Sequence, residues 1–432
     1  MPIQLDLSHT SKDVALENVL LRGARIVSLI IYDDLDRRPL FLQLLKASGP
    51  SVERLHIHCD GGRRPKKQAA HEVLQDLPSL RQLYVSLYSI PVDRLVAPNL
   101  VHLALDETGC SRAITVPSIL GALRNSPRLE TLFISNSSVD PRPTRHHSPV
   151  SLPYLHSIEL GSCEVRSDLV VHLQLPPNIA VGFRMLPVAD VASVRGIRGD
   201  IPLAVVANMQ HVLGRIDIRC ITLAVPPYPQ VVPDLLVRFE GLQASLEITT
   251  QADTYTELPD VFFGPRGILF SHSPRINNAR ELLIIGCPFI GNQVLDHINL
   301  AMPNIVSISF FHCKAPQVLV LPPQTNPSSP PFLHLERIMV LGPELWLGGM
   351  VKARRDCGVP IKTLIVGRGS GGFKYNHMED YTALEEFVDD LRVGCPTEIF
   401  DWGSENEILN VWSAIRKPGP VSSFYGKLVI LD

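Results

Sequence analysis

The chain has no long hydrophobic run, no signal peptide at its start and no excess of basic residues. A membrane-spanning helix needs about 18 or more consecutive apolar residues, and the sequence contains no such run. The formal net charge is −3 at pH 7, whereas a general binder of nucleic acid or of membrane surfaces needs a basic excess. We therefore expect neither a membrane nor a nucleic acid among the partners.

The sequence also lacks paired cysteines. Its eight cysteines lie tens of residues apart, and no two form a Cys-x-x-Cys pair. Without a signal peptide, this spacing is typical of buried thiols in a reducing compartment. We expect an intracellular protein, cytoplasmic or nuclear.

A short apolar pattern recurs along the chain. The spacing Leu-x-x-Leu-x-Leu, with Ile or Val as substitutes, occurs at residues 100–105, 129–134 and 155–160. Leucine-rich repeats carry Asn or Cys shortly after this pattern, and Cys163 occupies that place. Further copies begin at residues 26, 52, 80, 213, 279, 305, 335 and 361, with a partial copy at 246–248.

The copies are spaced mostly in the mid-twenties of residues, within the leucine-rich-repeat period of about 20–29. Segments between them place apolar residues three and four apart and are predicted as helices. These are residues 38–46, 68–76, 118–125, 167–173, 292–299, 344–356 and 382–393. We predict one continuous α/β leucine-rich-repeat solenoid over residues 1–432, with a curved parallel sheet inside, helices outside and irregular or inserted segments near 176–213 and 243–279.

Several of these segments resemble the leucine-rich-repeat regions of fungal F-box proteins. The segments are 52–57 (VERLHI), 77–83 (LPSLRQL), 120–132 (LGALRNSPRLETL), 152–158 (LPYLHSI), 173–178 (LQLPPN) and 357–364 (CGVPIKTL). The resemblance implies a module whose repeats hold the protein substrate of a ubiquitin ligase. No helical F-box precedes Ile3, so a cullin-ligase adaptor is expected as a partner only if an F-box lies upstream. A repeat scaffold unrelated to ubiquitin ligation is the alternative.

The repeat pattern predicts a binding face. Side chains alternate along a strand, so the residues on either side of the second leucine project from the same, concave face of the sheet. The predicted partner-binding residues are Arg54, His56, Gln82, Tyr84, His102, Thr131, Phe133, Ser157 and Glu159. In later copies the same positions hold Arg215, Asp217, Ser307, Ser309, Arg337 and Met339. Aromatic side chains among polar neighbours are typical of binding hot spots; a merely solvated sheet face is the alternative.

One glycine-rich sequence resembles a nucleotide-binding motif. Gly367, Gly369 and Gly372 form a G-x-G-x-x-G sequence after a predicted strand, which is typical of dinucleotide-binding loops. The acidic residues about 20 positions on, Glu386, Asp389 and Asp390, fall within a predicted helix and not at the end of a second strand. A glycine-rich turn is therefore favoured over a nucleotide-dependent enzyme.

The cluster His56-Ile-His58-Cys59 contains metal-ligand types, but Cys59 should point away from the two histidines. Cys163, Cys287 and Cys313 follow repeats and are expected to be inert packing residues. We predict no catalytic residue, no cofactor and no metal, and a protein-binding function without enzymatic activity.

Overall fold

The structure is a computed structural model. It describes residues 2–6, 25–33, 49–59, 77–86, 92, 95–106, 114–135, 139, 148–161, 167–185, 203–224, 234–251, 276–286, 292–311, 332–341, 347–367 and 381–394. The chain divides into two compact units, each of which is described by itself. Unit 1 comprises Met1–Val188, Pro202–Val212 and Gly419–Asp432, and unit 2 comprises Ala189–Ile201 and Leu213–Pro418.

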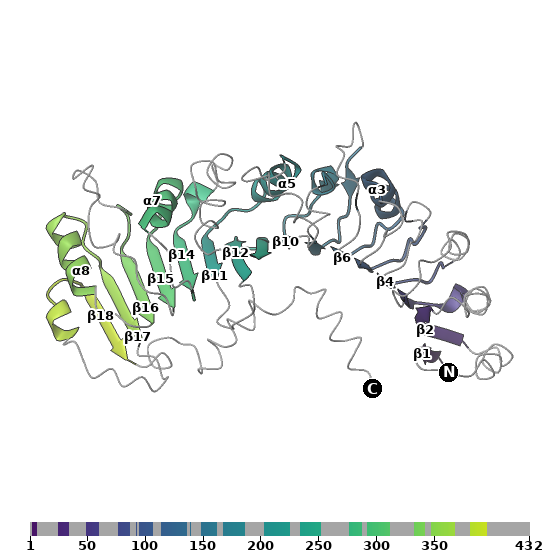
Figure 1. The fold of residues 1–432 in the computed structure, drawn as a ribbon, viewed down its shortest axis with the longest axis horizontal. Coiled ribbons are helices and arrows are strands. Elements are labelled where there is room, and N and C mark those ends of the chain that lie inside the picture. Colours follow the sequence, from purple (N-terminus) through teal and green to yellow (C-terminus); the bar gives the residue numbers. More distant parts are fainter. Residues whose placement is uncertain are drawn as a thin grey trace, which may run out of the picture. The chain divides into compact units, whose positions relative to one another are not determined.

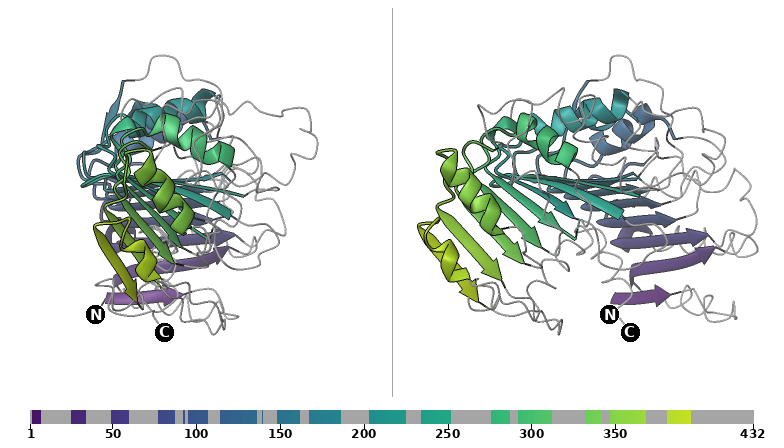
Figure 2. Two further views of the ribbon diagram at one scale, coloured as in Figure 1. Left: turned by 90° about the vertical axis from the view of Figure 1, so that its left-hand side faces the viewer. Right: turned by 60° about the vertical axis from the view of Figure 1, so that its left-hand side comes forward.

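The predicted α/β class is confirmed: few helices accompany a large, mostly parallel sheet. In unit 1 eight strands pair in sequence order, and every pairing is parallel. They are β1 (Pro2–Asp6), β2 (Arg25–Asp33), β3 (Arg54–Cys59), β4 (Gln82–Ser86), β5 (His102–Asp106), β6 (Thr131–Ser135), β8 (Ser157–Leu160) and β10 (Ala180–Met185). Figures 1 and 2 show these strands side by side, with α3 (Val116–Arg124) on one face of the sheet.

Smaller elements lie between these strands or follow β10. Strands β7 (Val150–Ser151) and β9 (Leu173–Gln174) form a separate parallel pair. The 3-10 helices η2 (Gly49–Ser51) and η5 (Val170–His172) are one turn each. Helix α5 (Leu203–Leu213) was not predicted from the sequence; its Asn208 side chain donates to the carbonyl of Ser167 over 2.7 Å.

Unit 2 contains the strand order β13-β12-β11-β14-β15-β16-β17-β18. Strands β11 (Cys220–Ala224), β12 (Asp234–Glu240) and β13 (Ser245–Gln251) pair antiparallel, and all later pairings are parallel. The later strands are β14 (Glu281–Ile285), β15 (Ser307–Phe311), β16 (Arg337–Leu341), β17 (Thr363–Gly367) and β18 (Asp390–Gly394). The helical elements are η7 (Ile276–Asn278), α7 (Asn292–Ala301), α8 (Leu347–Asp356) and η9 (Tyr381–Leu384).

The apolar positions of the repeats form the core. In β5 and the turn before it, Leu100 and Leu105 are fully buried and Leu103 is 2% exposed. The equivalent Ile361, Leu364 and Val366 of unit 2 are all fully buried. The spacing therefore identifies the buried positions in both units.

One backbone arrangement recurs where the strands begin. The carbonyl of Arg81 accepts the N–H groups of Val101 and His102 over 2.7 and 2.9 Å, and other repeats repeat this bonding. We call these acceptors entry carbonyls. They belong to Glu53, Arg81, Val101 and Glu130 in unit 1, and to Arg219, Arg280, Val306, Glu336 and Lys362 in unit 2.

A tight turn precedes most of these strands. The N–H of Leu80 donates to the carbonyl of Leu77 over 3.1 Å, and the N–H of Leu129 donates to Ser126 over the same distance. Proline follows the first residue of both turns, where its fixed φ suits a turn and its missing N–H is not needed.

Two repeat assignments from the sequence were wrong. Strand β11 starts at Cys220, so the copy in register is Ile218-x-x-Ile221-x-Leu223 and not residues 213–218. Consequently Arg215 and Asp217 are exposed residues that precede the strand. The partial copy at 246–248 lies in β13, which belongs to an antiparallel hairpin and not to a parallel repeat.

The helix predictions had mixed outcomes. Helices α3, α7 and α8 confirm the predictions at 118–125, 292–299 and 344–356. The segment 167–173 contains only the 3-10 turn η5. The segment 382–393 is not a helix, because β18 pairs with β17 from Asp390 onward. The segments 38–46 and 68–76 lie outside the described residues.

Candidate binding face of unit 1

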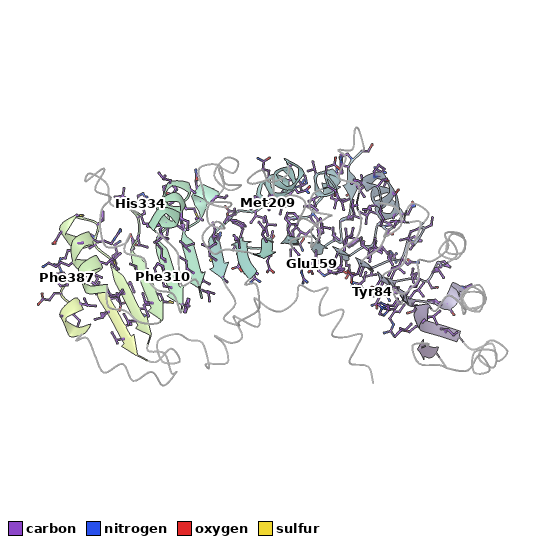
Figure 3. All side chains as sticks on the ribbon, in the orientation of Figure 1. Tyr84, Glu159, Met209, Phe310, His334 and Phe387 are labelled. Atoms are coloured by element: carbon purple, nitrogen blue, oxygen red, sulfur yellow. The ribbon has the colours of Figure 1, made fainter. Side chains whose placement is uncertain are left out.

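All nine predicted binding residues lie in two adjacent rows across unit 1. The parallel strands are in register, so equivalent side chains of successive strands are direct neighbours. The first row consists of Ser28, Arg54, Gln82, His102, Thr131 and Ser157. The second row consists of Ile30, His56, Tyr84, Ala104, Phe133 and Glu159. Figure 3 shows Tyr84 and Glu159 on the side of the strands opposite α3.

The rows are exposed only in part, around β3 to β5. There Arg54 is exposed and His56, Gln82 and His102 are half-buried, whereas Tyr84 and Ala104 are buried. The row residues of β2, β6 and β8 are buried, with exposed fractions of 7% for Thr131, 5% for Phe133, 3% for Ser157 and 5% for Glu159. Alternation along a strand identifies the face of a residue, but it does not report whether the face is covered.

Aromatic side chains form the centre of the second row. Tyr84, Ala104 and Phe133 pack together as a buried cluster. The His56 ring meets the Tyr84 ring edge-on, with centroids 4.1 Å apart and an interplanar angle of 85°. Such an arrangement suits the ring quadrupoles and fixes the half-buried histidine against the cluster.

His102 is held in its neutral form. Burial lowers the pKa of His102, and His156 and Arg81 lower it further, while Glu130 opposes them. The Nδ1 atom lies 2.7 Å from the Thr131 hydroxyl oxygen. At neutral pH this imidazole therefore contributes a hydrogen-bonding group and not a positive charge.

An ion pair lies at the far end of the second row. Arg184 on β10 pairs with the buried carboxylate of Glu159. Gly182 is the register neighbour of Glu159, and a Cβ placed there would lie 3.5 Å from the Glu159 side chain. This is an ordinary van der Waals distance, so the Glu159 side chain does not depend on a glycine at position 182.

A groove follows the edge of the sheet where the strands of unit 1 begin. Its main hollow, of about 600 Å³, is lined by Glu53, Ser79, Arg81, Asn99, Val101, Arg128, Glu130 and Tyr154. A second hollow of about 170 Å³ shares Glu53, Arg81 and Val101 and adds Arg54, Gln82 and His102 from the first row. We call the two together the edge groove.

The sequence analysis did not identify Arg81, Arg128 or Tyr154. A sequence signal for them exists: Arg81 is the residue after the first leucine of its repeat. Arg128 and Tyr154 are the residues that follow the turn prolines. These positions recur with the repeats, but they lie before the strands and not on them.

The corresponding face of unit 2 is more apolar. Register pairs Ser307 with Arg337 and Ser309 with Met339, which confirms that each pair shares a face of neighbouring strands. Next to them Ala224, Leu236, Ile285 and Phe311 form a buried cluster, against which Leu283 and Met339 pack.

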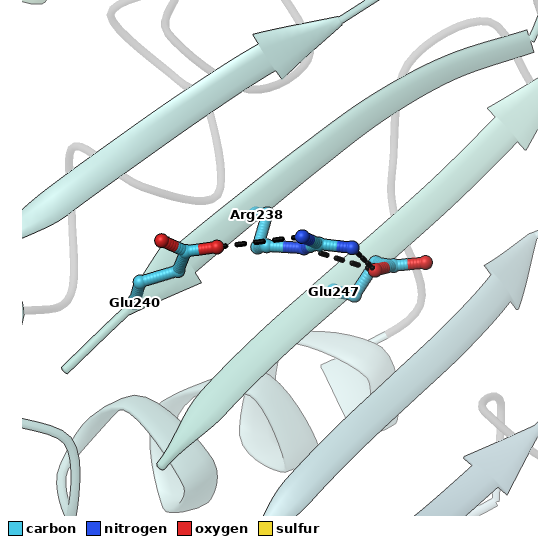
Figure 4. Close-up of polar contacts among 3 residues, drawn as sticks. All are labelled: Arg238, Glu240 and Glu247. Atoms are coloured by element: carbon cyan, nitrogen blue, oxygen red, sulfur yellow. Dashed lines mark hydrogen bonds and ion pairs between the residues drawn. The ribbon is translucent and has the colours of Figure 1, made fainter. Parts of the chain in front are cut away.

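The hairpin of unit 2 carries a small network of charged side chains. Arg238 donates to Glu247 over 2.6 Å and to Glu240 over 3.4 Å (Figure 4). Burial raises the pKa of the neighbouring Cys220 thiol to about 12, with a further contribution from Glu240 and Glu281. This thiol stays protonated and unreactive at neutral pH.

The structure describes only part of the glycine-rich sequence at 367–372 and the acidic residues after it. Gly367 is the last residue of β17, whereas Gly369 and Gly372 lie outside the described residues. Asp390 begins β18, contrary to the predicted helix. A ribose-binding acid belongs at the carboxyl end of the second strand, so Asp390 lies at the wrong edge of the sheet.

Metal-ligand side chains do not converge in the part of the chain that is described: no group of three or more His, Cys, Asp or Glu residues could hold a metal ion. His56 and His58 share a strand face as expected from their spacing. Cys163, Cys287 and Cys313 lie outside the described residues.

Comparison with protein-family models and with curated proteins yields no match for this chain. Among the described residues, no helix is both long enough and apolar enough to span a bilayer. Any function must therefore be inferred from the arrangement of the residues themselves.

Proposed function

We propose that this chain is a protein-binding leucine-rich-repeat solenoid without catalytic activity, acting as the substrate-recognition region of an F-box-like ubiquitin-ligase component. The observation that supports the proposal is the alignment of the nine residues in two rows on one face of a parallel sheet. Stacked repeats create such extended surfaces for partners.

The accessible part of the face is the part around β3 to β5. Arg54 can form charge-assisted hydrogen bonds, and Gln82 and His102 can act as neutral donors and acceptors. The buried Tyr84–Phe133 cluster supports these residues from one side. A partner would bind by complementarity of shape and side chains, with the rigid strands limiting the entropy lost on binding.

The proposal is tested by affinity capture with the full chain and two matched variants. His56→Glu introduces a charge at a half-buried position of the second row, and Ser309→Glu does so on β15 at the half-buried equivalent position of unit 2. We expect proteins captured by the wild type to be retained by Ser309→Glu and lost with His56→Glu. Equal capture by all three chains would contradict a partner-binding face in unit 1.

The ubiquitin-ligase link has a separate test. Co-purification of a cullin adaptor with the chain, or with a longer form that carries an F-box, would support the link. A partner that depends on His56 without any adaptor in the captured material would favour the scaffold alternative.

A further inference from the structure

We infer that the edge groove of unit 1 holds an acidic peptide segment of the partner protein, whose carboxylates are bound by Arg54, Arg81 and Arg128. This inference rests on the proposed function, because the ligand is part of a protein. It adds a second contact surface and the chemical class of the segment bound there.

The first support comes from the three guanidinium groups. Arg54, Arg81 and Arg128 are all exposed, and all three line the edge groove. The ion pairs found among the described residues do not include them. Arg128 donates one hydrogen bond, to the side-chain oxygen of Asn99 over 3.2 Å, which orients its guanidinium and leaves further N–H groups to donate. Guanidinium groups of this kind bind carboxylates through paired hydrogen bonds.

The second support is the rigidity of the groove. The Ser79 hydroxyl donates to the carbonyl of Pro50 over 2.6 Å, and the Asn99 amide donates to the carbonyl of Pro78 over 2.9 Å. Each bond joins a turn to the turn of the preceding repeat, so the wall of the groove is set before a ligand arrives. A preformed wall reduces the entropy that a ligand loses on binding.

Apolar surface lies between the charges. Val101 is half-buried within the groove, and the Tyr154 side chain lines it with 63% of its surface exposed. An exposed tyrosine offers a large contact area and a hydroxyl group to a peptide. The groove therefore suits a ligand with both carboxylates and uncharged parts.

Charges of both signs lie along the edge. Glu53, Arg81, Val101 and Glu130 come from successive repeats and are joined by the entry-carbonyl bonds. Neighbouring strands are about 4.8 Å apart, so the sign changes within one or two such spacings. A uniformly charged polyanion such as RNA would place phosphates against Glu53 and Glu130. A peptide can place carboxylates at the arginines and uncharged or basic residues at the glutamates.

The experiment measures binding of a fluorescein-labelled twelve-residue acidic peptide of alternating Glu and Ser by fluorescence polarisation at low salt. Full-length wild type is compared with Arg81→Gln, Arg128→Gln and the control Arg280→Gln. Arg280 is an exposed residue at the same place in its repeat as Arg81, with the same entry-carbonyl bonding. We expect binding to weaken roughly tenfold for each unit 1 variant and to be unchanged for Arg280→Gln.

Two further measurements keep the outcome decisive. Arg81→Lys retains the charge but not the paired hydrogen bonds, so we expect intermediate binding. A peptide in which Glu is replaced by Gln should bind no variant. The inference is overturned if wild type and the unit 1 variants bind the acidic peptide equally, if none binds it, or if a single-stranded RNA of similar length binds more tightly than the peptide.

Failure here is distinguishable from failure of the proposed function. If the acidic peptide does not bind but captured partners still depend on His56, the partner uses the strand face alone. If the peptide binds as expected while capture is insensitive to His56→Glu, the strand face is the part of the proposal that is wrong.

Discussion

The two units of this protein share a backbone scheme and differ in the side chains displayed on it. In both, fully buried leucines or isoleucines precede the strands, and one entry carbonyl accepts two N–H groups from the next repeat. The face of unit 1 carries arginine, histidine, glutamine and an aromatic cluster, whereas the face of unit 2 carries an apolar cluster around Phe311.

This difference separates the residues that specify the fold from those that are free to specify a ligand. The entry carbonyls involve only backbone atoms, so the neighbouring side chains vary without disturbing them: Arg81, Val101 and Glu130 all take part. The units also diverge in one structural respect, because unit 2 contains an antiparallel hairpin that unit 1 lacks among its described strands. Four experiments test how far the two units are alike.

The largest effect is expected from the core positions. Leu132→Ala in unit 1 and Leu364→Ala in unit 2 each remove a fully buried side chain at the same place in a repeat. Each should lower the free energy of unfolding by about 2–5 kcal/mol, measured by urea denaturation. Unchanged resistance to protease in either variant would mean that the unit concerned does not depend on stacked repeats.

A smaller loss of stability is expected when Arg354, a buried arginine of unit 2, is replaced. Arg354 is 3% exposed and donates to the carbonyl of Phe332 over 2.8 Å, while the Asn299 side chain accepts from the Phe332 N–H over 2.6 Å. Phe332 has φ of 53°, a strained value for a non-glycine residue. Arg354→Met should cost about 1–3 kcal/mol, because the Phe332 carbonyl loses its hydrogen bond from a charged donor and keeps only the one from the Leu335 N–H over 3.0 Å.

The adjacent Arg355 provides the control for this substitution. It is exposed, and its guanidinium lies 5.8 Å from the centre of the Phe387 ring. Arg355→Met should change the free energy of unfolding by less than about 1 kcal/mol. Equal losses for the two variants would show that burial of Arg354 does not matter.

The turns of the two units should respond alike. Asn99 donates to the carbonyl of Pro78 and Asn304 donates to the carbonyl of Asn277, over 2.9 and 2.8 Å. Replacing either asparagine by Ala should cost about 0.5–1 kcal/mol, measured by chemical denaturation. Losses that differ between units by more than this would contradict equivalent turns.

The smallest expected effect is the contribution of His102 to the pH dependence of stability in unit 1. Since the folded protein holds the pKa of His102 below its ordinary value, chiefly through burial, the unfolded chain binds the proton first. The resulting loss of folding stability is absent above about pH 6.5. It grows as the pH falls through the window between the unfolded and folded pKa values of His102. His102→Gln should therefore lose less stability than wild type between about pH 7.5 and pH 5.5, in urea titrations.

The sequence predicted the strand face of unit 1 because two rules agree there. The spacing of Leu129, Leu132 and Ile134 defines which side chains are buried, and alternation then places Thr131 and Phe133 on the other face. Register between parallel strands, which the sequence does not display, is what brought the residues of different repeats into rows. Coverage of the face depends on contacts far apart in the chain, and no local pattern reports it.

The wrong assignments have a common physical cause. Val388, Leu391 and Val393 are spaced as in the repeats, yet Leu384, Val388 and Leu391 also fit a helix. Short apolar runs satisfy both periods, and pairing of Leu391 with Leu364 decided in favour of the strand. Short patterns can also overlap: residues 213–218 and 218–223 both have the repeat spacing, so the copy before β11 was placed five residues too early. The hairpin turn contains a glycine, Gly241, which the sequence does display. A Cβ added there would lie 2.9 Å from the Asp217 carbonyl oxygen.

The entry carbonyls give each unit a direction. The acceptor always belongs to the earlier repeat and the two donors to the later one. A protein shortened from its amino end would present two unpaired N–H groups at the new boundary, and one shortened from its carboxyl end would present a single carbonyl. Native proteins tolerate an unsatisfied carbonyl better than an orphaned N–H, so stepwise deletions from opposite ends should not be mirror images.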